Sequence, residues 1–212
     1  MKKILSLLLI LAFAQNNYAQ SMRQIMVSMP DSIMPLLTKV NREDCMDYLD
    51  SKMKAEVTNR IGSKSEMTKI TDDYAQFKLS KSSERTFKLL PTADNDTIIC
   101  MITTCCGPVC DSKLDFFDNK WNRYKKRIIE PPTLKDFISK PDSINEDKFN
   151  NLLNKADILL MKADFKNNSN DLTLTLTTNE YLNEDDRESL KPFFKKEITL
   201  EWNGKKFEKK SK

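Results

Sequence analysis

The sequence contains no histidine, only three glycines, and no stretch of 18 apolar residues beyond its N-terminal run. Without imidazole, the Ser-His-Asp and Cys-His nucleophilic arrangements are excluded, as is every zinc site that depends on histidine. Three glycines are too few for most phosphate-cradling loops, and no P-loop, dinucleotide-binding fingerprint or EF-hand loop occurs. Ser-Lys chemistry, carboxylate pairs and thiol chemistry remain open.

The single long apolar run lies at the start of the chain. Two lysines precede residues 4–14 (ILSLLLILAFA), and small residues follow. This order is typical of a cleavable signal peptide, and the run is shorter than the roughly 20 apolar residues of a membrane span. We expect residues 1–19 to be removed before Gln20, with cleavage after Ala14 as the alternative. The sequence therefore predicts an exported protein, periplasmic or extracellular.

The remainder of the chain, residues 20–212, has the length of a single domain. Its first cysteine, Cys45, is far from the cleavage point, so we do not expect a lipoprotein. The formal charge of +4 falls to about +2 when the two N-terminal lysines are removed. This balance predicts a solvated surface, without a nucleic-acid partner and without membrane insertion after cleavage.

Hydrophobic periodicity predicts an α+β fold. Apolar residues recur at every fourth position from Cys45 to Ile61, up to Gly62, which predicts a long helix whose apolar stripe packs on a sheet. From Tyr74 the period becomes two. Strands are expected at residues 74–79, 86–90, 97–105, 113–117, 158–165, 172–176 and 197–202, with a helix from about 183 to 194 and a hairpin turn at 203–204. We expect an antiparallel sheet packed by an N-terminal helix.

The two halves of this domain, residues 20–127 and 142–212, resemble each other loosely. FKLLPTADNDTIICMITT and DSKLDFFDNKWNRY have rough counterparts in ADFKNNSNDLTLTLTT and KKEITLEWNGKKFEK. In each half, strands joined by polar turns end in an aromatic residue beside an asparagine turn. A tandem repeat of two β-rich halves is one interpretation.

Three of the five cysteines lie within residues 105–110, CCGPVC. The spacing is close to a thioredoxin-like redox motif, but Cys106 and Cys110 are separated by three residues instead of two, and a strand follows where that chemistry needs a helix. Gly107-Pro108 indicates a hairpin turn instead. In an oxidising compartment we expect a structural disulfide, with Cys106 and Cys110 as the favoured pair. A thiol-dependent redox activity or a thiolate metal site at Cys105, Cys106 and Cys110 is the alternative.

Aromatic residues near the strand ends are candidates for an interaction surface if they are exposed together. They are Phe116, Phe117, Trp121 and Trp202, with Phe193 and Phe194. Among the 31 acidic residues, no pair is singled out as the carboxylate pair of a glycoside hydrolase. We therefore assign no catalytic residue, no metal ligand and no cofactor, and favour a protein that is not an enzyme.

Several segments also carry a resemblance to a known group of proteins. They are MPDSIMPLLTKVNREDCMDYLDSKM, TDDYAQFKLSKSSERTFKLLP, DSKLDFFDNKW and TLTLTTNEYLNEDDRESLKPFFKKEITLEWNGKKF. In these the chain resembles an uncharacterised family of exported Bacteroidales proteins, over nearly the whole length after the signal segment. The resemblance implies export and a single domain, and it implies no activity and no site residue.

These observations favour a non-enzymatic protein of the cell envelope that binds a protein, a peptide or a glycan through an exposed sheet face or edge. The thiol-dependent activity and a hydrolase with a carboxylate pair are the competing hypotheses.

Overall fold

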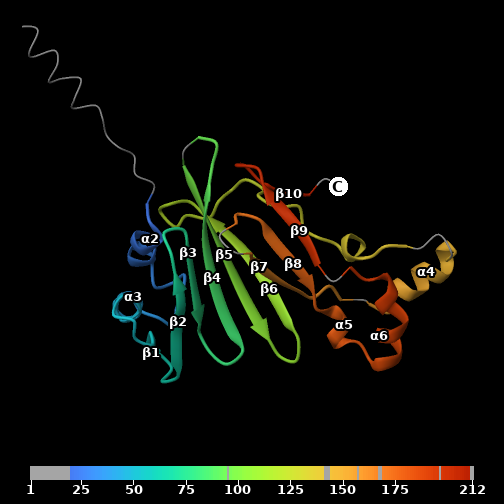
Figure 1. The fold of residues 1–212 in the computed structure, drawn as a ribbon, viewed down its shortest axis with the longest axis horizontal. Helices are drawn as coiled ribbons and strands as arrows, with labels where there is room; N and C mark the ends of the chain where they lie inside the picture. The colour runs from blue at the N-terminus through green and yellow to red at the C-terminus, as the bar shows by residue number, and fades with distance from the viewer. Residues whose placement is uncertain are drawn as a thin grey trace, which may run out of the picture.

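The computed structural model describes residues 20–210 except 95, 141–143, 157, 167–168 and 196. The expected signal peptide, residues 1–19, lies outside the described residues. The described chain is an α+β structure with two antiparallel sheets and a few short helices, as expected (Figure 1). Helices α2 and α3 lie at one side of the molecule, and the helices of the second half lie at the other.

The N-terminal helices begin at side-chain caps encoded in the sequence. Helix α2 (Met22–Ser28) has Ser21 as its N-cap, and helix α3 (Lys39–Asp50) has Thr38. In each helix the residue at the third position reaches back to the backbone N–H of the cap, which completes a capping box. Both helices bury apolar residues against the first sheet.

The long helix expected up to Ile61 is wrong in its second half, because α3 ends at Asp50. Lys52 takes a left-handed conformation with φ of 57°, which stops the helix. Val57 is buried as a residue of strand β1 (Glu56–Thr58), while Met53 and Ile61 are 58% and 71% exposed. Apolar residues therefore recur at every fourth position beyond the end of the helix, where they do not share one buried face.

The first sheet, called here the large sheet, has six strands in chain order, each antiparallel to the next. After β1 come β2 (Lys64–Ile70), β3 (Tyr74–Lys78), β4 (Ser83–Pro91), β5 (Thr97–Cys106) and β6 (Cys110–Phe117). β1 and β2 were not expected, because their residues are mostly polar and one bulge between Met67 and Lys69 interrupts the alternation.

The small sheet has four strands in the order β10-β9-β8-β7. Its strands are β7 (Met161–Phe165), β8 (Leu172–Leu176), β9 (Glu197–Trp202) and β10 (Phe207–Lys209). Short helical segments connect the sheets and the strands: η1 (Leu134–Phe137), α4 (Glu146–Leu153), α5 (Thr178–Tyr181), α6 (Glu184–Leu190) and η2 (Lys191–Phe193).

Two hydrophobic cores lie on opposite faces of the large sheet. The first core joins α2 and α3 to one face, where Phe77, Phe87 and Ile99 are fully buried. The second core joins the other face of β4 and β5 to the small sheet, through residues such as Cys100 and Leu174. Alternate residues of one strand therefore serve different cores, since strand side chains alternate between faces.

The counterpart segments lie on β4 to β6 and on β7 to β10, and each set of strands forms an antiparallel meander. The two meanders belong to different sheets and share the second core. The first two residues of the expected second half, 142–143, lie outside the described residues.

Candidate ligand-binding site

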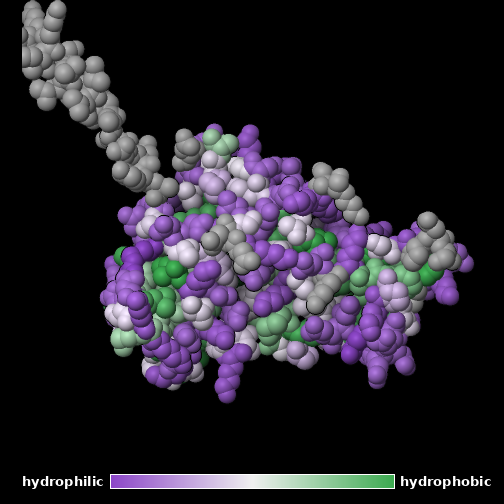
Figure 2. All heavy atoms as spheres, in the orientation of Figure 1, coloured by the Kyte–Doolittle hydropathy of each residue, from purple (hydrophilic) through white to green (hydrophobic). Residues whose placement is uncertain are grey.

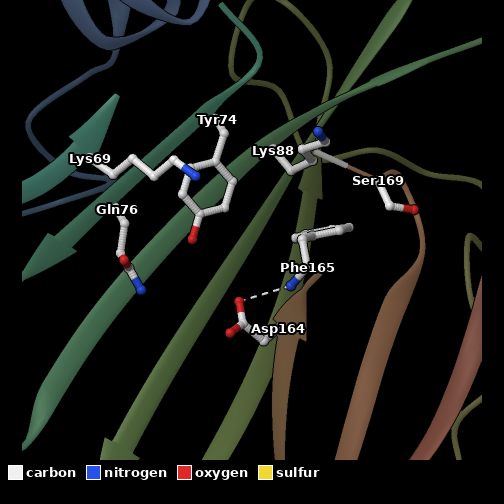
Figure 3. A pocket seen from close by; sticks show the side chains of 7 residues that line it. All are labelled: Lys69, Tyr74, Gln76, Lys88, Asp164, Phe165 and Ser169. Atoms are coloured by element: carbon white, nitrogen blue, oxygen red, sulfur yellow. Dashed lines mark hydrogen bonds between the residues drawn. The ribbon is translucent and has the colours of Figure 1, made fainter. Parts of the chain in front are cut away.

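A polar cavity lies between strand β7 of the small sheet and the face of strands β2 to β4 of the large sheet (Figure 3). Its volume is about 160 Å³. The lining residues come from β2, β3 and β4 on one side and from β7 and the segment after it on the other. They are Lys69, Tyr74, Gln76, Lys88, Asp164, Phe165 and Ser169.

Strand register explains why the large-sheet residues meet. Tyr74 is the cross-strand partner of Lys88, and Gln76 is the partner of Lys69 because of the bulge in β2. Tyr74 and Gln76 are two residues apart on β3 and therefore point to the same face. The small sheet covers β4 to β6 on this face, while much of β2 and β3 is left open and polar.

Lys88 is the least expected member of this wall. It stands between buried apolar residues of β4, is 1% exposed, and donates to Asp73 Oδ2 at 2.5 Å. Burial works to raise the pKa of the Asp73 carboxyl, but hydrogen bonds from Lys88 and Thr71 and the charge of Lys88 outweigh it and hold that pKa below its usual range. The pair therefore fixes a positive charge at the cavity wall with its counter-ion beside it.

Tyr74 supplies both an aromatic ring and a hydroxyl. Burial raises the pKa of its phenol, a hydrogen bond with Thr86 opposes this, and the negative charges of Asp164 and Glu84 add to the rise. The hydroxyl thus remains protonated at neutral pH. The Lys69 ammonium lies 5.2 Å from the centre of the Tyr74 ring, a cation-π contact that holds this exposed lysine over the cavity.

Asp164 closes the opposite side. One of its carboxylate oxygens accepts the Phe165 backbone N–H at 2.8 Å, and Figure 3 shows this bond at the edge of β7. The outward N–H groups of Met161 and Ala163 are bound by Asp111 Oδ1 at 3.2 Å and by Ser112 Oγ at 3.0 Å. This edge of β7 is therefore closed to an added strand, because its donors are already used.

The cavity contains donors and acceptors but no evident catalytic arrangement. Asp164 is the one carboxylate among the described lining residues, so no second acid faces it as a glycosidase pair requires. In the described part of the chain, no three Cys, Asp or Glu side chains are grouped as metal ligands. Holding a polar ligand is the chemistry that this arrangement offers.

The cysteine segment has a different place in the fold. Cys106 and Cys110 are cross-strand partners at the end of the β5–β6 hairpin, and their Sγ atoms are joined at 2.02 Å. Cys105 is an exposed free thiol, and Cys45 and Cys100 are buried free thiols. Burial raises the pKa of Cys45 to about 11 and also raises the pKa of Cys100, so neither is a reactive thiolate. The pair Cys106–Cys110 is thus a hairpin disulfide and does not hold a metal as thiolates.

The candidate aromatics do not form one exposed patch. Phe117 and Trp121 are only 2% and 7% exposed and belong to the first core, so their expected role in an interaction surface is wrong. Phe116 faces the second core with Trp202, whose indole N–H donates to the Pro91 carbonyl. Alternation along β6 sends the two adjacent phenylalanines to opposite faces of the sheet. Figure 2 shows mostly hydrophilic side chains on the viewed face, with smaller apolar areas among them.

Sequence reasoning missed all the cavity residues. One signal was present: Lys88 interrupts the apolar run of β4 between Phe87 and Leu89, and a lysine inside a buried strand needs a partner. The contribution of β7 had no local signal, since it depends on how the small sheet crosses the large one.

The fold and the cavity define a two-sheet α+β protein with a polar pocket at the junction of its sheets. The chain belongs to the family described as "Protein of unknown function (DUF3256)", whose family model matches residues 14–207. This is a family of unknown function, as the resemblance implied. No curated protein matches the chain.

A similar fold is found in the solved structure of a domain of an uncharacterized protein from Porphyromonas gingivalis W83. That structure is 20% identical in sequence, has a TM-score of 0.79, and matches over 92% of this chain and 100% of its own. At this identity the likeness shows a shared fold. None of the described helices is long and apolar enough to cross a membrane.

Proposed function

We propose that this protein is an exported, non-enzymatic binding module of the cell envelope, whose ligand is held in the cavity between β7 and the large sheet. The observation that carries the proposal is the convergence of Lys69, Tyr74 and Gln76 with Asp164 from a different sheet. Most polar side chains on a sheet face solvent singly, whereas these surround one partly enclosed space.

The fixed geometry of the wall supports binding. Lys88 is held by Asp73, and Asp164 is held by the β7 backbone. The hydroxyl of Thr68 donates to Gln76 Oε1 at 3.1 Å, which fixes the orientation of the amide. Groups that are oriented before a ligand arrives lose less conformational entropy on binding.

The position of the cavity favours the sheet face over the sheet edge as the ligand contact. The outward N–H groups of β7 are bound by side chains, and β1, one of the two edge strands of the large sheet, is only three residues long. No observation favours the thiol-dependent alternative, because Cys106 and Cys110 are joined to each other, Cys45 and Cys100 are buried in different cores, and Cys105 is exposed.

The proposal is tested by nuclear magnetic resonance on the ¹⁵N-labelled chain starting at Gln20. Neutral oligosaccharides, tetrapeptides, succinate and inorganic phosphate are added separately, and amide shifts are followed. We expect one class to shift signals of residues 69–76 and 164–169 together. If every class leaves both segments unshifted, or shifts only residues elsewhere, the cavity is not the binding site.

A blocking variant supplies the matched test. Ser169→Trp places a large side chain at the cavity wall, whereas Ser189→Trp places the same side chain on the exposed face of α6. We expect binding of the active class to be lost in the first variant and kept in the second. Equal binding by both variants would contradict the proposed site.

Export is tested separately. Expression of the full chain in a Bacteroidetes host, followed by cell fractionation and mass determination of the product, should give a chain beginning at Gln20 outside the cytoplasm. A full-length product in the cytoplasm would refute export.

A further inference from the structure

We infer that the ligand of this cavity is an oligosaccharide, with one neutral sugar ring seated among Tyr74, Gln76 and Asp164. This inference rests on the proposed function and names the class of ligand. It is carried by the size of the cavity, by its mixture of donors and acceptors, and by a second hollow on the same sheet face.

The size of the cavity fits a single ring. A closed protein cavity of about 150 Å³ holds a benzene molecule. The cavity found here has a similar volume, about 160 Å³, and is partly open, so one six-membered sugar ring can be seated in it with some of its hydroxyl groups outside. The space is too small for a folded peptide segment or a nucleotide, which fill the pockets of several hundred Å³ typical of larger ligands.

The polar groups of the cavity match hydroxyl groups, which donate and accept at once. Asp164 offers carboxylate oxygen as an acceptor, since only one of its oxygens is used by the Phe165 backbone N–H. Gln76 uses its carbonyl oxygen to accept from Thr68, which leaves its amide N–H groups as donors. The Lys69 ammonium is a second donor, and Tyr74 and Phe165 supply apolar surface for the C–H groups of a ring.

The charges at the cavity argue against an anionic ligand. The two lysines of the wall are matched by Asp164 in the wall and by Asp73, which binds Lys88 at 2.5 Å. An added carboxylate or phosphate would meet the unpaired side of Asp164, and like charges at short distance repel in a partly buried site. A neutral ligand rich in hydroxyl groups meets no such opposition.

The surroundings of the cavity indicate a chain of sugars instead of a single one. Lys78 follows Gln76 by two residues on β3, so the two side chains lie about 7 Å apart on the same face. Lys78 lines a shallower hollow of about 370 Å³ together with Glu66 and Lys64. A sugar chain that leaves the cavity along β3 would enter this second hollow, which is again polar and mixed in charge.

The test measures binding by calorimetry with maltose, cellotetraose, xylotetraose, mannotetraose and chitotetraose, and with succinate and inorganic phosphate as anionic comparators. We expect at least one neutral tetrasaccharide to bind and to shift signals of residues 69–78 and 164–169. Its disaccharide should bind at least about tenfold more weakly, because it reaches one hollow only.

Two variants assign the contacts. Asp164→Asn keeps an oxygen for the Phe165 N–H but removes the charge, and we expect it to weaken the tetrasaccharide at least about tenfold, the loss typical of a hydrogen bond to a charged group. Glu180→Gln makes the same chemical change on α5, near the other end of β7, and should change affinity less than about twofold. Lys78→Ala should weaken the tetrasaccharide and leave the disaccharide unchanged.

Failure of this inference can be distinguished from failure of the proposed function. If succinate, phosphate or a peptide shifts the cavity signals and no oligosaccharide does, the ligand class is wrong and the binding site stands. If no oligosaccharide shifts these signals, or if Asp164→Asn and Glu180→Gln bind a tetrasaccharide equally well, the inference is overturned.

Discussion

Replacing Arg42 removes a guanidinium group that is fully buried between α2, α3 and the segment that joins them. The group makes four hydrogen bonds: Nε to the Met26 carbonyl at 3.0 Å, Nη1 to the Leu37 carbonyl at 2.9 Å and to Asp31 Oδ1 at 3.0 Å, and Nη2 to the Met29 carbonyl at 2.5 Å. Its partners include the carbonyls at the end of α2, which have no helical partner of their own. Arg42 therefore holds the Met-rich N-terminal segment on the large sheet.

We predict that Arg42→Ala lowers the free energy of unfolding by about 4 kcal/mol. Each of the four bonds to this charged donor contributes about 1 kcal/mol or more, and three of the partners left behind are carbonyls of buried residues. Loss of one partner of a buried ion pair generally costs about 3–5 kcal/mol, which agrees with this sum. Arg42→Lys should cost nearly as much, because one ammonium cannot reach all these acceptors.

The measurement is urea unfolding followed by tryptophan fluorescence, since Trp121 is buried in the first core. With a denaturant slope of about 2 kcal/mol per molar, the midpoint should fall by about 2 M. Arg60→Ala is the matched control: Arg60 binds the same Asp31 at 2.7 Å but is 48% exposed, so its loss should cost less than about 1 kcal/mol. If Arg42→Ala and Arg60→Ala lower the midpoint equally, the structural role given to Arg42 is refuted.

Three further predictions concern the cavity, the hairpin and the first core. Asp73→Asn should destabilise the protein at neutral pH, because it leaves Lys88 buried without its counter-ion. The variant should also lose less stability than the unchanged protein below about pH 4, since a carboxyl with a lowered pKa stabilises the fold above its unfolded pKa and loses this effect as the pH falls. Urea unfolding at pH 3 and pH 6 measures both effects, and an unchanged pH dependence would contradict the prediction. Replacing Cys106 and Cys110 together by serine should lower the free energy of unfolding by about 2 kcal/mol, since the closed loop is short. Ligand binding should stay intact, because Cys106 lies about 20 Å along β5 from the level of Lys88. Calorimetric titration of the double variant tests this, and lost affinity would show that the disulfide is coupled to the cavity. Trp121→Ala should lower the free energy of unfolding in urea by about 3–5 kcal/mol, as expected for a core residue. A loss below about 1 kcal/mol would contradict the burial of Trp121 in the first core.

Strand β8 of the second core could be predicted because its apolar and polar residues alternate strictly. Leu172, Leu174 and Leu176 all point to the second core, as the period of two requires. The hairpin pairing of Cys106 with Cys110 was expected for a similar reason, since Gly107-Pro108 marks a turn and the cysteines lie on either side of it. In both cases the information is local, lying within a few residues of the chain.

The helix beyond Asp50 and the aromatic surface could not be predicted correctly from the same kind of pattern. Apolar residues at every fourth position share a face only in a helix, and the backbone leaves the helix at Lys52. The pair Phe116 and Phe117 reads as one aromatic cluster in sequence, yet the sheet has a core on each face and takes one ring into each.

The sequence by itself determined the antiparallel α+β class and the absence of imidazole chemistry, and it favoured the disulfide at the β5–β6 turn. Each of these depends on composition or on neighbours in the chain. Only the tertiary structure decided where the cavity lies, because Tyr74 and Asp164 are 90 positions apart in the sequence. They meet because both sheets bury their apolar faces in one core, and that packing places β7 on β5 and β6, next to the polar part of the large sheet.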